Sequence, residues 1–137
     1  MKGLLVMERT QIKQVVRQLA KTEINQVVDT QFVTKHVAER ISRLDEYIRL
    51  GLDTNDYIAG FEVDKGHTNG NEYHLITTTG LIKVYNKHSA KLITILGARG
   101  GQIYRYFAAL NLPLTNQVNE LISMCYERER QNPIHLK

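Results

Sequence analysis

The chain has 137 residues, of which 42% are hydrophobic and 23% charged, and this composition is typical of one compact globular domain rather than a disordered chain. Its net charge is +4, and its single cysteine, Cys125, excludes an intrachain disulfide and indicates a reducing compartment. The first apolar stretch, residues 4–7, is too short for a signal peptide or a membrane span. We therefore expect a cytoplasmic protein that has no membrane partner.

Residues 1–60 are expected to be mainly helical. Apolar side chains recur with a period near 3.6 over residues 7–28 and again over residues 34–50. Thr34 is a suitable N-cap for the second of these helices, and Gly51 is a suitable residue at its end. One further helical turn is expected over residues 53–58.

Residues 61–98 have the pattern of an antiparallel sheet. Residues 73–78, 81–85 and 92–96 are rich in β-branched and aromatic side chains, and residues 61–64 alternate between apolar and acidic. Short connections make neighbouring strands antiparallel. Residues 101–130 then predict two helices, a short one over 102–110 and a last one that Thr115 caps. The sequence thus predicts a single α+β domain, in which a meander of three or four strands packs on helices.

The excess positive charge lies in one block of the sequence. Residues 73–119 contain no Asp or Glu and carry five cations: Lys83, Lys87, Lys91, Arg99 and Arg105. A concentration of charge of this kind makes a phosphate-bearing partner, above all a nucleic acid, the first hypothesis.

The second predicted helix carries the first group of candidate residues. Spacings of three and four place four side chains on one helix face that could reach over the edge of the sheet: His36, Arg40, Arg43 and Tyr47. The neighbouring arginines favour the neutral form of His36, which is the form that acts as a base. The alternative is a solvated helix face whose charge is balanced by the helix's own acidic residues.

The second group lies on the predicted sheet. Ile82 and Val84 point to one side of their strand, and Lys83 and Tyr85 point to the other. If the helices cover the Ile82 side, then Lys83 and Tyr85 lie on an open face. His74 belongs to the preceding strand, and its side depends on a register that the sequence does not give. A lone histidine in a strand is more often structural than catalytic.

The third group is the glycine-rich turn at residues 97–101 and the helix after it. Glycines before a helix let backbone N–H groups approach a phosphate, and Arg99 and Arg105 can pair with phosphate oxygens. Tyr104 and Tyr106 can stack on unpaired bases. The alternative is a strand-to-helix turn whose aromatic residues belong to the core. The five histidines show no metal-site spacing, so we expect neither a metal nor another cofactor.

Residues 34–41 read Thr-Lys-His-Val-Ala-Glu-Arg-Ile, and they precede strand segments that read Gly-Leu-Ile-Lys-Val-Tyr-Asn at 80–86 and Lys-Leu-Ile-Thr at 91–94. This combination resembles the barnase/EndoU/colicin/RelE-like (BECR-fold) group of small ribonuclease and toxin domains. The resemblance covers about residues 34–106. It implies cleavage of RNA without a metal, through attack of the ribose 2′-OH on the adjacent phosphate.

The resemblance also implies residue roles. His36 would be the general base or acid, Lys83 or Arg99 would stabilise the charge of the phosphorane, and Thr94 would hydrogen-bond the phosphate. Nucleic-acid contacts are expected from a further set of residues: Arg40, His74, Tyr85, Lys87, Lys91, Tyr104, Arg105 and Tyr106. The toxin-like type makes an acidic inhibitor protein a candidate partner.

Two other functions fit the same sequence. A regulator or accessory protein of a mobile element or phage would bind nucleic acid through Arg99 and Arg105, and its affinity would depend on salt. A non-catalytic interaction protein would instead form a homo-oligomer through its amphipathic first and last helices.

Overall fold

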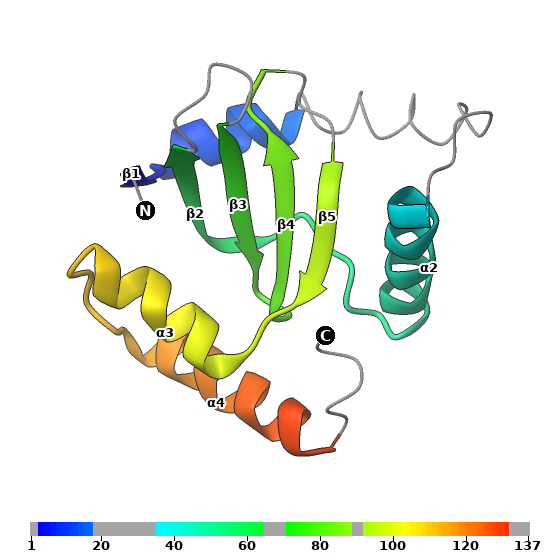
Figure 1. The fold of residues 1–137 in the computed structure, drawn as a ribbon. Coiled ribbons are helices and arrows are strands. Elements are labelled where there is room, and N and C mark those ends of the chain that lie inside the picture. Colours follow the sequence, from blue (N-terminus) through cyan, green and yellow to red (C-terminus); the bar gives the residue numbers. More distant parts are fainter. Residues whose placement is uncertain (1–2, 18–34, 65–70, 89–91, 132–137) are drawn as a thin grey trace.

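The computed structural model describes residues 3–17, 35–64, 71–88 and 92–131, and in the second helix it describes side chains from residue 42 onward. Strand β1 (Gly3–Val6) precedes a helix whose described part covers residues 9–17, called here the N-terminal helix. After α2 (Lys35–Arg49) come β2 (Tyr57–Asp64), β3 (Glu72–Thr77), β4 (Leu81–Asn86) and β5 (Leu92–Gly97). Helices α3 (Gly100–Ala109) and α4 (Asn116–Gln131) follow (Figure 1).

The five strands form one sheet in the order of the chain, and each neighbouring pair is antiparallel. The predicted α+β class is confirmed, but the sheet has more strands than the expected three or four. Strand β1 was not predicted because four residues are too few to show a period of two. The helical turn expected over residues 53–58 is wrong, since Tyr57 and Ile58 begin β2.

The end of α2 confirms the expectation for Gly51. Gly51 has a φ of 71°, a left-handed conformation that costs glycine little. The Leu52 N–H donates to the Tyr47 carbonyl at 2.8 Å, and the Gly51 N–H donates to the Ile48 carbonyl at 3.0 Å. These two bonds make a Schellman motif, which ends the helix and turns the chain toward the sheet.

The two predicted N-caps have different outcomes. Thr115 accepts a hydrogen bond from the Val118 N–H at 3.3 Å, so it caps α4 as expected. Thr34 lies outside the described residues, as do residues 18–28 of the first predicted helix.

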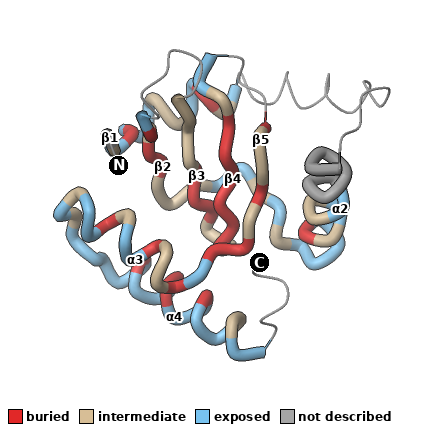
Figure 2. Tube along the Cα trace, viewed as in Figure 1, coloured by how far each residue is buried: buried red, intermediate tan, exposed pale blue. Residues whose placement is uncertain are grey.

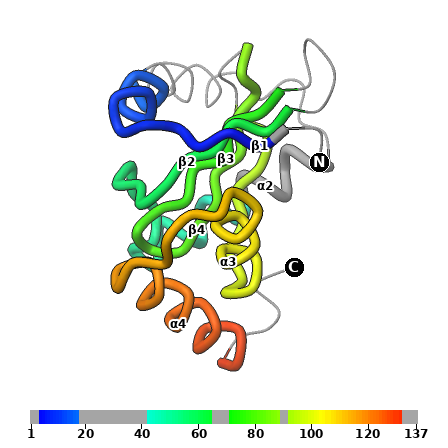
Figure 3. The backbone as a smooth tube through the Cα atoms, turned by 90° about the vertical axis from the view of Figure 1, so that its left-hand side faces the viewer, coloured from blue at the N-terminus to red at the C-terminus, as the bar shows by residue number. Residues whose placement is uncertain are grey.

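Helices cover the sheet on both sides (Figure 3). The face that carries Phe61, His74, Ile76, Ile82 and Val84 packs on α3 and α4, and we call it the α3/α4 face. Its core continues into the two helices through Ala98, Ile103, Phe107, Val118, Leu121, Ile122 and Cys125. Each large apolar side chain that is buried there contributes roughly 1.5–3 kcal/mol.

The opposite face carries Leu75, Lys83 and Tyr85, and we call it the rear face. Met7, just before the N-terminal helix, and Val15, on its inner side, pack against Leu75 and Tyr85. Helix α2 lies beside β5, and its Tyr47 packs on the rear face with Leu81 and Ile95. The buried residues accordingly concentrate on the central strands and on the inner sides of the helices (Figure 2).

The cover of the α3/α4 face is incomplete. Both helices cross the half of the sheet near the turn that joins β3 to β4 (Figure 1). The other half, where β3 begins at Glu72 and β4 ends at Asn86, is not crossed by any helix of the described part of the chain. This half is the less covered part of the α3/α4 face, although the N-terminal helix packs behind it on the rear face, and several polar side chains lie on it.

Candidate functional site

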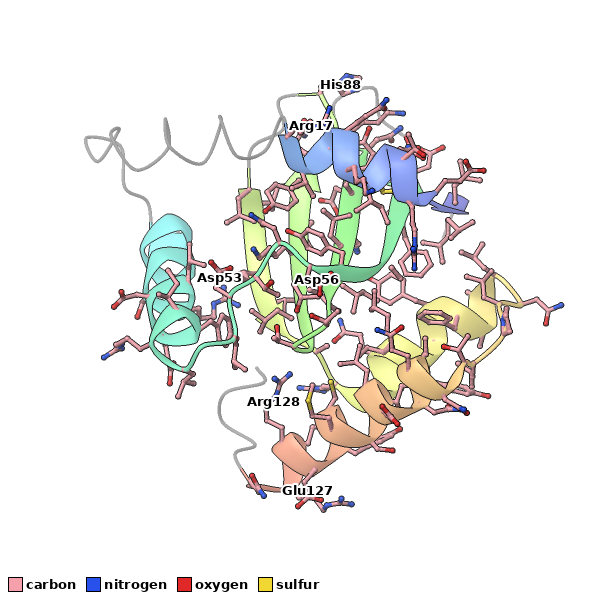
Figure 4. The ribbon with its side chains drawn as sticks, turned by 180° about the vertical axis from the view of Figure 1, so that it is seen from behind. Arg17, Asp53, Asp56, His88, Glu127 and Arg128 are labelled. Atoms are coloured by element: carbon pink, nitrogen blue, oxygen red, sulfur yellow. The ribbon has the colours of Figure 1, made fainter. Side chains whose placement is uncertain are left out.

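The structure does not leave Lys83 on an open face. Its side chain is 4% exposed, and its Nζ lies 2.8 Å from Asp53 Oδ1 and 3.0 Å from the Thr54 carbonyl. The segment between α2 and β2 crosses the rear face and carries these acceptors (Figure 4). A buried ammonium is stable only when it is paired, and this one has its partners already. The expectation of an open face at Lys83 is therefore wrong.

Other members of the acid-free block are also engaged. Tyr85 is fully buried on the rear face. Lys87 pairs with Glu62 of β2, and this hydrogen bond raises the pKa of Lys87. Lys91 lies outside the described residues. Because Lys83 and Lys87 are neutralised by carboxylates from outside the block, the five cations do not form one phosphate site.

The glycine-rich turn serves the packing of α3 on α4. A Cβ on Gly100 would lie 2.5 Å from the Tyr126 ring, so only glycine allows this close approach. The Gly100 N–H donates to Glu129 Oε1 at 3.0 Å, and a carboxylate therefore already holds the N-terminus of α3. Arg99, Tyr104 and Arg105 are exposed at the surface. The phosphate cradle expected at this turn is not supported.

A hydrogen-bonded chain of three side chains lies on the less covered half of the α3/α4 face. His74 Nδ1 is 2.5 Å from the Tyr106 hydroxyl, and His74 Nε2 is 2.9 Å from Glu72 Oε1. The Tyr106 ring stacks on Phe61 with a centroid distance of 4.9 Å, which fixes the ring beneath the histidine. The side chains of Glu72 and His74 are 19% and 14% exposed, so this hydrogen-bonded chain of side chains reaches the surface.

The partners determine where the protons lie. A carboxylate only accepts, so Nε2 of His74 carries a proton and donates it to Glu72. When the imidazole is neutral, its Nδ1 accepts from the Tyr106 hydroxyl. Burial, together with the charge of Glu72, raises the pKa of Tyr106 to about 12, which keeps this hydroxyl a donor. The arrangement orients the histidine between a hydroxyl and a carboxylate.

The strand register places Thr94 in the same row as His74. His74 pairs with Val84, and Val84 pairs with Thr94. Thr94 therefore lies on the α3/α4 face, and the extra residue Ile93, opposite Val84 and Tyr85, leaves Leu92 paired with Tyr85 on the rear face. Cross-strand neighbours are about 5 Å apart, so His74 and Thr94 lie roughly 10 Å apart on this face. Thr94 and Lys83 consequently project to opposite faces, and the predicted catalytic set does not converge.

A cation reaches this row from α2. Arg43 Nη2 donates to Thr94 Oγ1 at 3.4 Å, and none of the described carboxylates lies within ion-pair distance of Arg43. The α2 face therefore does reach over the sheet edge at Arg43, whereas Tyr47 is buried in the core. His36 and Arg40 belong to α2, and their side chains lie outside the described part.

Glu72 directly precedes the acid-free block. The charge pattern of residues 73–119 therefore does not include the carboxylate that orients His74. The available signal was the spacing Glu-x-His at residues 72–74, which puts both side chains on one face of a strand.

The raised pKa of Tyr106 leads to a prediction about alkaline stability. Tyr106 ionises near pH 10 in the unfolded chain and near pH 12 in the folded chain, so its contribution is complete below pH 10 and is lost as the pH rises toward 12. The loss should be on the order of 2 kcal/mol. In Tyr106→Phe, the free energy of unfolding measured with urea should fall less steeply over this interval.

Tyr104→Phe is the matched control, since Tyr104 lies on the same helix and is 50% exposed. Tyr47 and Tyr73 also have raised pKa values because of burial, so part of the alkaline loss should remain in both variants. Equal pH dependence in Tyr106→Phe and wild type would contradict the prediction.

Comparisons of the chain with protein-family models, with curated proteins and with solved structures find no match. Among the described residues, no group of three or more His, Cys, Asp or Glu side chains is placed to hold a metal ion. Within the same ranges, no helix has the length and apolar character needed to span a membrane.

Proposed function

We propose that the protein binds RNA across the row His74–Val84–Thr94 and cleaves it through the ribose 2′-OH. The observation that carries this proposal is the Glu72–His74–Tyr106 chain, an oriented acid–base group on the less covered half of the α3/α4 face. Arg43 and Thr94 lie in the same row and supply a cation and a hydroxyl for a phosphate. The sequence resemblance to small ribonuclease domains implies the same reaction, but the site proposed here uses His74 and Arg43 in place of His36 and Lys83.

The proposed step uses protein groups and water. The 2′-oxygen forms a bond to phosphorus as the bond from phosphorus to the 5′-oxygen breaks. The 2′-OH proton passes to the Tyr106 oxygen while the Tyr106 proton passes to His74 Nδ1, and Glu72 stabilises the resulting imidazolium. The guanidinium of Arg43, about 10 Å along the row from His74, pairs with a neighbouring phosphate and holds the strand in place. The departing 5′-oxygen takes its proton from water.

A substrate pair tests the reaction. One oligonucleotide carries a single ribonucleotide in an otherwise 2′-deoxy strand, and its control is the same strand without the ribonucleotide. In EDTA the protein should cleave the first strand at the ribonucleotide, leave a 2′,3′-cyclic phosphate detectable by mass spectrometry, and leave the second strand intact. No cleavage of the first strand, or cleavage of both, would sink the proposal.

Arg43 should contribute to RNA binding, whereas Arg49 on the same helix should not. Arg43→Gln removes the cation at Thr94, and we expect the dissociation constant for single-stranded RNA to rise about fivefold to tenfold, with a weaker salt dependence. Arg49 lies 3.9 Å from Asp45 in an exposed pair, so Arg49→Gln should change the constant less than about twofold. Titration by fluorescence anisotropy at two salt concentrations separates the two, and equal effects would count against the row as the binding site.

A further inference from the structure

A second surface, separate from the Glu72–His74–Tyr106 chain, is a groove at the edge of the sheet. Its volume is about 670 Å³, and it lies between the N-terminal helix, the start of β2 and the connection from α3 to α4. The floor is largely aliphatic and includes Ile12, Val16, Ile58 and Leu112. This volume is within the range of ligand-binding sites.

One rim of the groove is a row of cations. Arg9, Lys13 and Arg17 line it, and their spacing of four residues places them on one side of the N-terminal helix. All three are exposed, and within the described ranges none is paired with a carboxylate. The lining includes a single acidic residue, Asp56, so the groove has a net positive charge (Figure 4).

The shape and charge select the occupant. With a rise of 1.5 Å per residue, the three cations are spaced about 6 Å apart and span about 12 Å. A partner helix with glutamates at every fourth position repeats its carboxylates at the same interval, and its apolar stripe can lie on the aliphatic floor. Nucleic acid fits less well because most of the floor is aliphatic and cannot stack on bases, and only two aromatic side chains, Tyr57 and Phe107, line the groove.

We propose that this groove is the docking site for an acidic amphipathic helix of a partner protein. Exposed apolar side chains at the adjoining end of β1 extend the apolar surface, since Leu5 is 63% and Val6 is 49% exposed. The contact has a desolvated apolar centre, and its rim of ion pairs sets the orientation of the helix. The docking surface does not depend on the proposed RNA cleavage.

The test uses a fluorescein-labelled peptide of about 18 residues, or five helical turns, with leucines on one face and glutamates at every fourth position beside them. Fluorescence anisotropy should show saturable binding of this peptide to the whole protein. The triple variant Arg9→Gln/Lys13→Gln/Arg17→Gln should raise the dissociation constant about tenfold or more, because three exposed pairs are lost. Leu112→Glu, which places a charge on the floor, should also weaken binding.

The matched control removes three exposed cations elsewhere, at Arg49, Arg105 and Arg130, and so changes the net charge equally. It should alter the peptide affinity less than about twofold, and circular dichroism checks that each variant is folded. Equal weakening by the two triple variants, or equal binding of a peptide with the same composition in scrambled order, would show attraction by charge alone and overturn the proposal. The absence of peptide binding would also overturn the proposal. A groove variant that loses RNA binding but keeps peptide binding would do the same.

Discussion

His74→Ala is expected to lower the rate of RNA cleavage about a hundredfold or more, because a positioned acid–base group contributes roughly 10²–10⁴ to such reactions. His74 is the middle member of the chain that joins Glu72 to Tyr106, and its removal breaks both hydrogen bonds. The affinity for an uncleavable 2′-deoxy strand should change much less, since Arg43 and Thr94 remain. Single-turnover cleavage of a fluorogenic oligoribonucleotide in EDTA measures the first quantity, and anisotropy measures the second.

His88→Ala is the control for this experiment, because His88 is an exposed histidine after β4 with no contact to the Glu72–His74–Tyr106 chain. It should cleave RNA at the wild-type rate. Glu72→Gln keeps the shape of the side chain but removes the charge that stabilises the imidazolium, and we expect a loss of about tenfold. If His74→Ala is folded and cleaves like wild type, another residue carries the reaction.

The order of helices and strands followed from the sequence because it is written in local patterns. A period near 3.6 located α2 and α4, and runs of β-branched and aromatic residues located β3, β4 and β5, to within about two residues. Thr115 and Gly51 marked helix ends through chemistry that acts over a few residues. The element that the sequence did not reveal, β1, is defined by its pairing with β2 about sixty residues later.

The face that each strand residue occupies could not be predicted in the same way. Lys83 alternates with apolar neighbours and thus looks like a surface residue. Its burial depends on Asp53, which lies thirty residues earlier and comes close only because the chain crosses the rear face after α2. The face of Leu92 depends on the extra residue Ile93, which shifts the alternation within β5: Thr94 shares the α3/α4 face with Leu96, whereas Leu92 pairs with Tyr85 on the rear face.

The candidate site was predicted only in part for the same reason. His74 and Tyr106 were both expected to contact nucleic acid, but their hydrogen bond joins β3 to α3 across 32 residues of sequence. The charge of the acid-free block pointed to Lys83 and Lys87, whose partners Asp53 and Glu62 lie outside the block. A count of charges along a sequence does not show which of them are neutralised in the fold.

Arg128→Met should lower the free energy of unfolding by about 3 kcal/mol, the largest loss of stability that we expect from a single polar side chain. Arg128 projects from α4 into the end of the sheet (Figure 4). Its Nη2 donates to the Gly80 carbonyl at 2.7 Å, and its Nη1 donates to the Thr79 carbonyl at 3.1 Å. The turn between β3 and β4 is thereby tied to α4. Methionine keeps most of the aliphatic packing but donates to neither carbonyl.

The local geometry leaves little room for a substitute. Gly80 has a φ of 84°, and a Cβ there would lie 2.9 Å from Cys125 Sγ, so helix and turn are in close contact. Water is largely excluded from such a contact, so the Thr79 carbonyl loses its donor, and the Gly80 carbonyl keeps only the hydrogen bond from the Ala98 N–H at 2.8 Å. The midpoint of thermal unfolding should therefore fall by roughly 10 °C, as measured by calorimetry.

Arg130→Met on the same helix is the control. Arg130 pairs with Glu127 three residues earlier, and both side chains are more than half exposed, so its loss should change stability by less than about 0.5 kcal/mol. A difference between the two variants isolates the carbonyl contacts from the charge and from helix propensity, which the substitutions share. Equal melting temperatures for the two variants would mean that the contacts of Arg128 with the turn contribute no net stability.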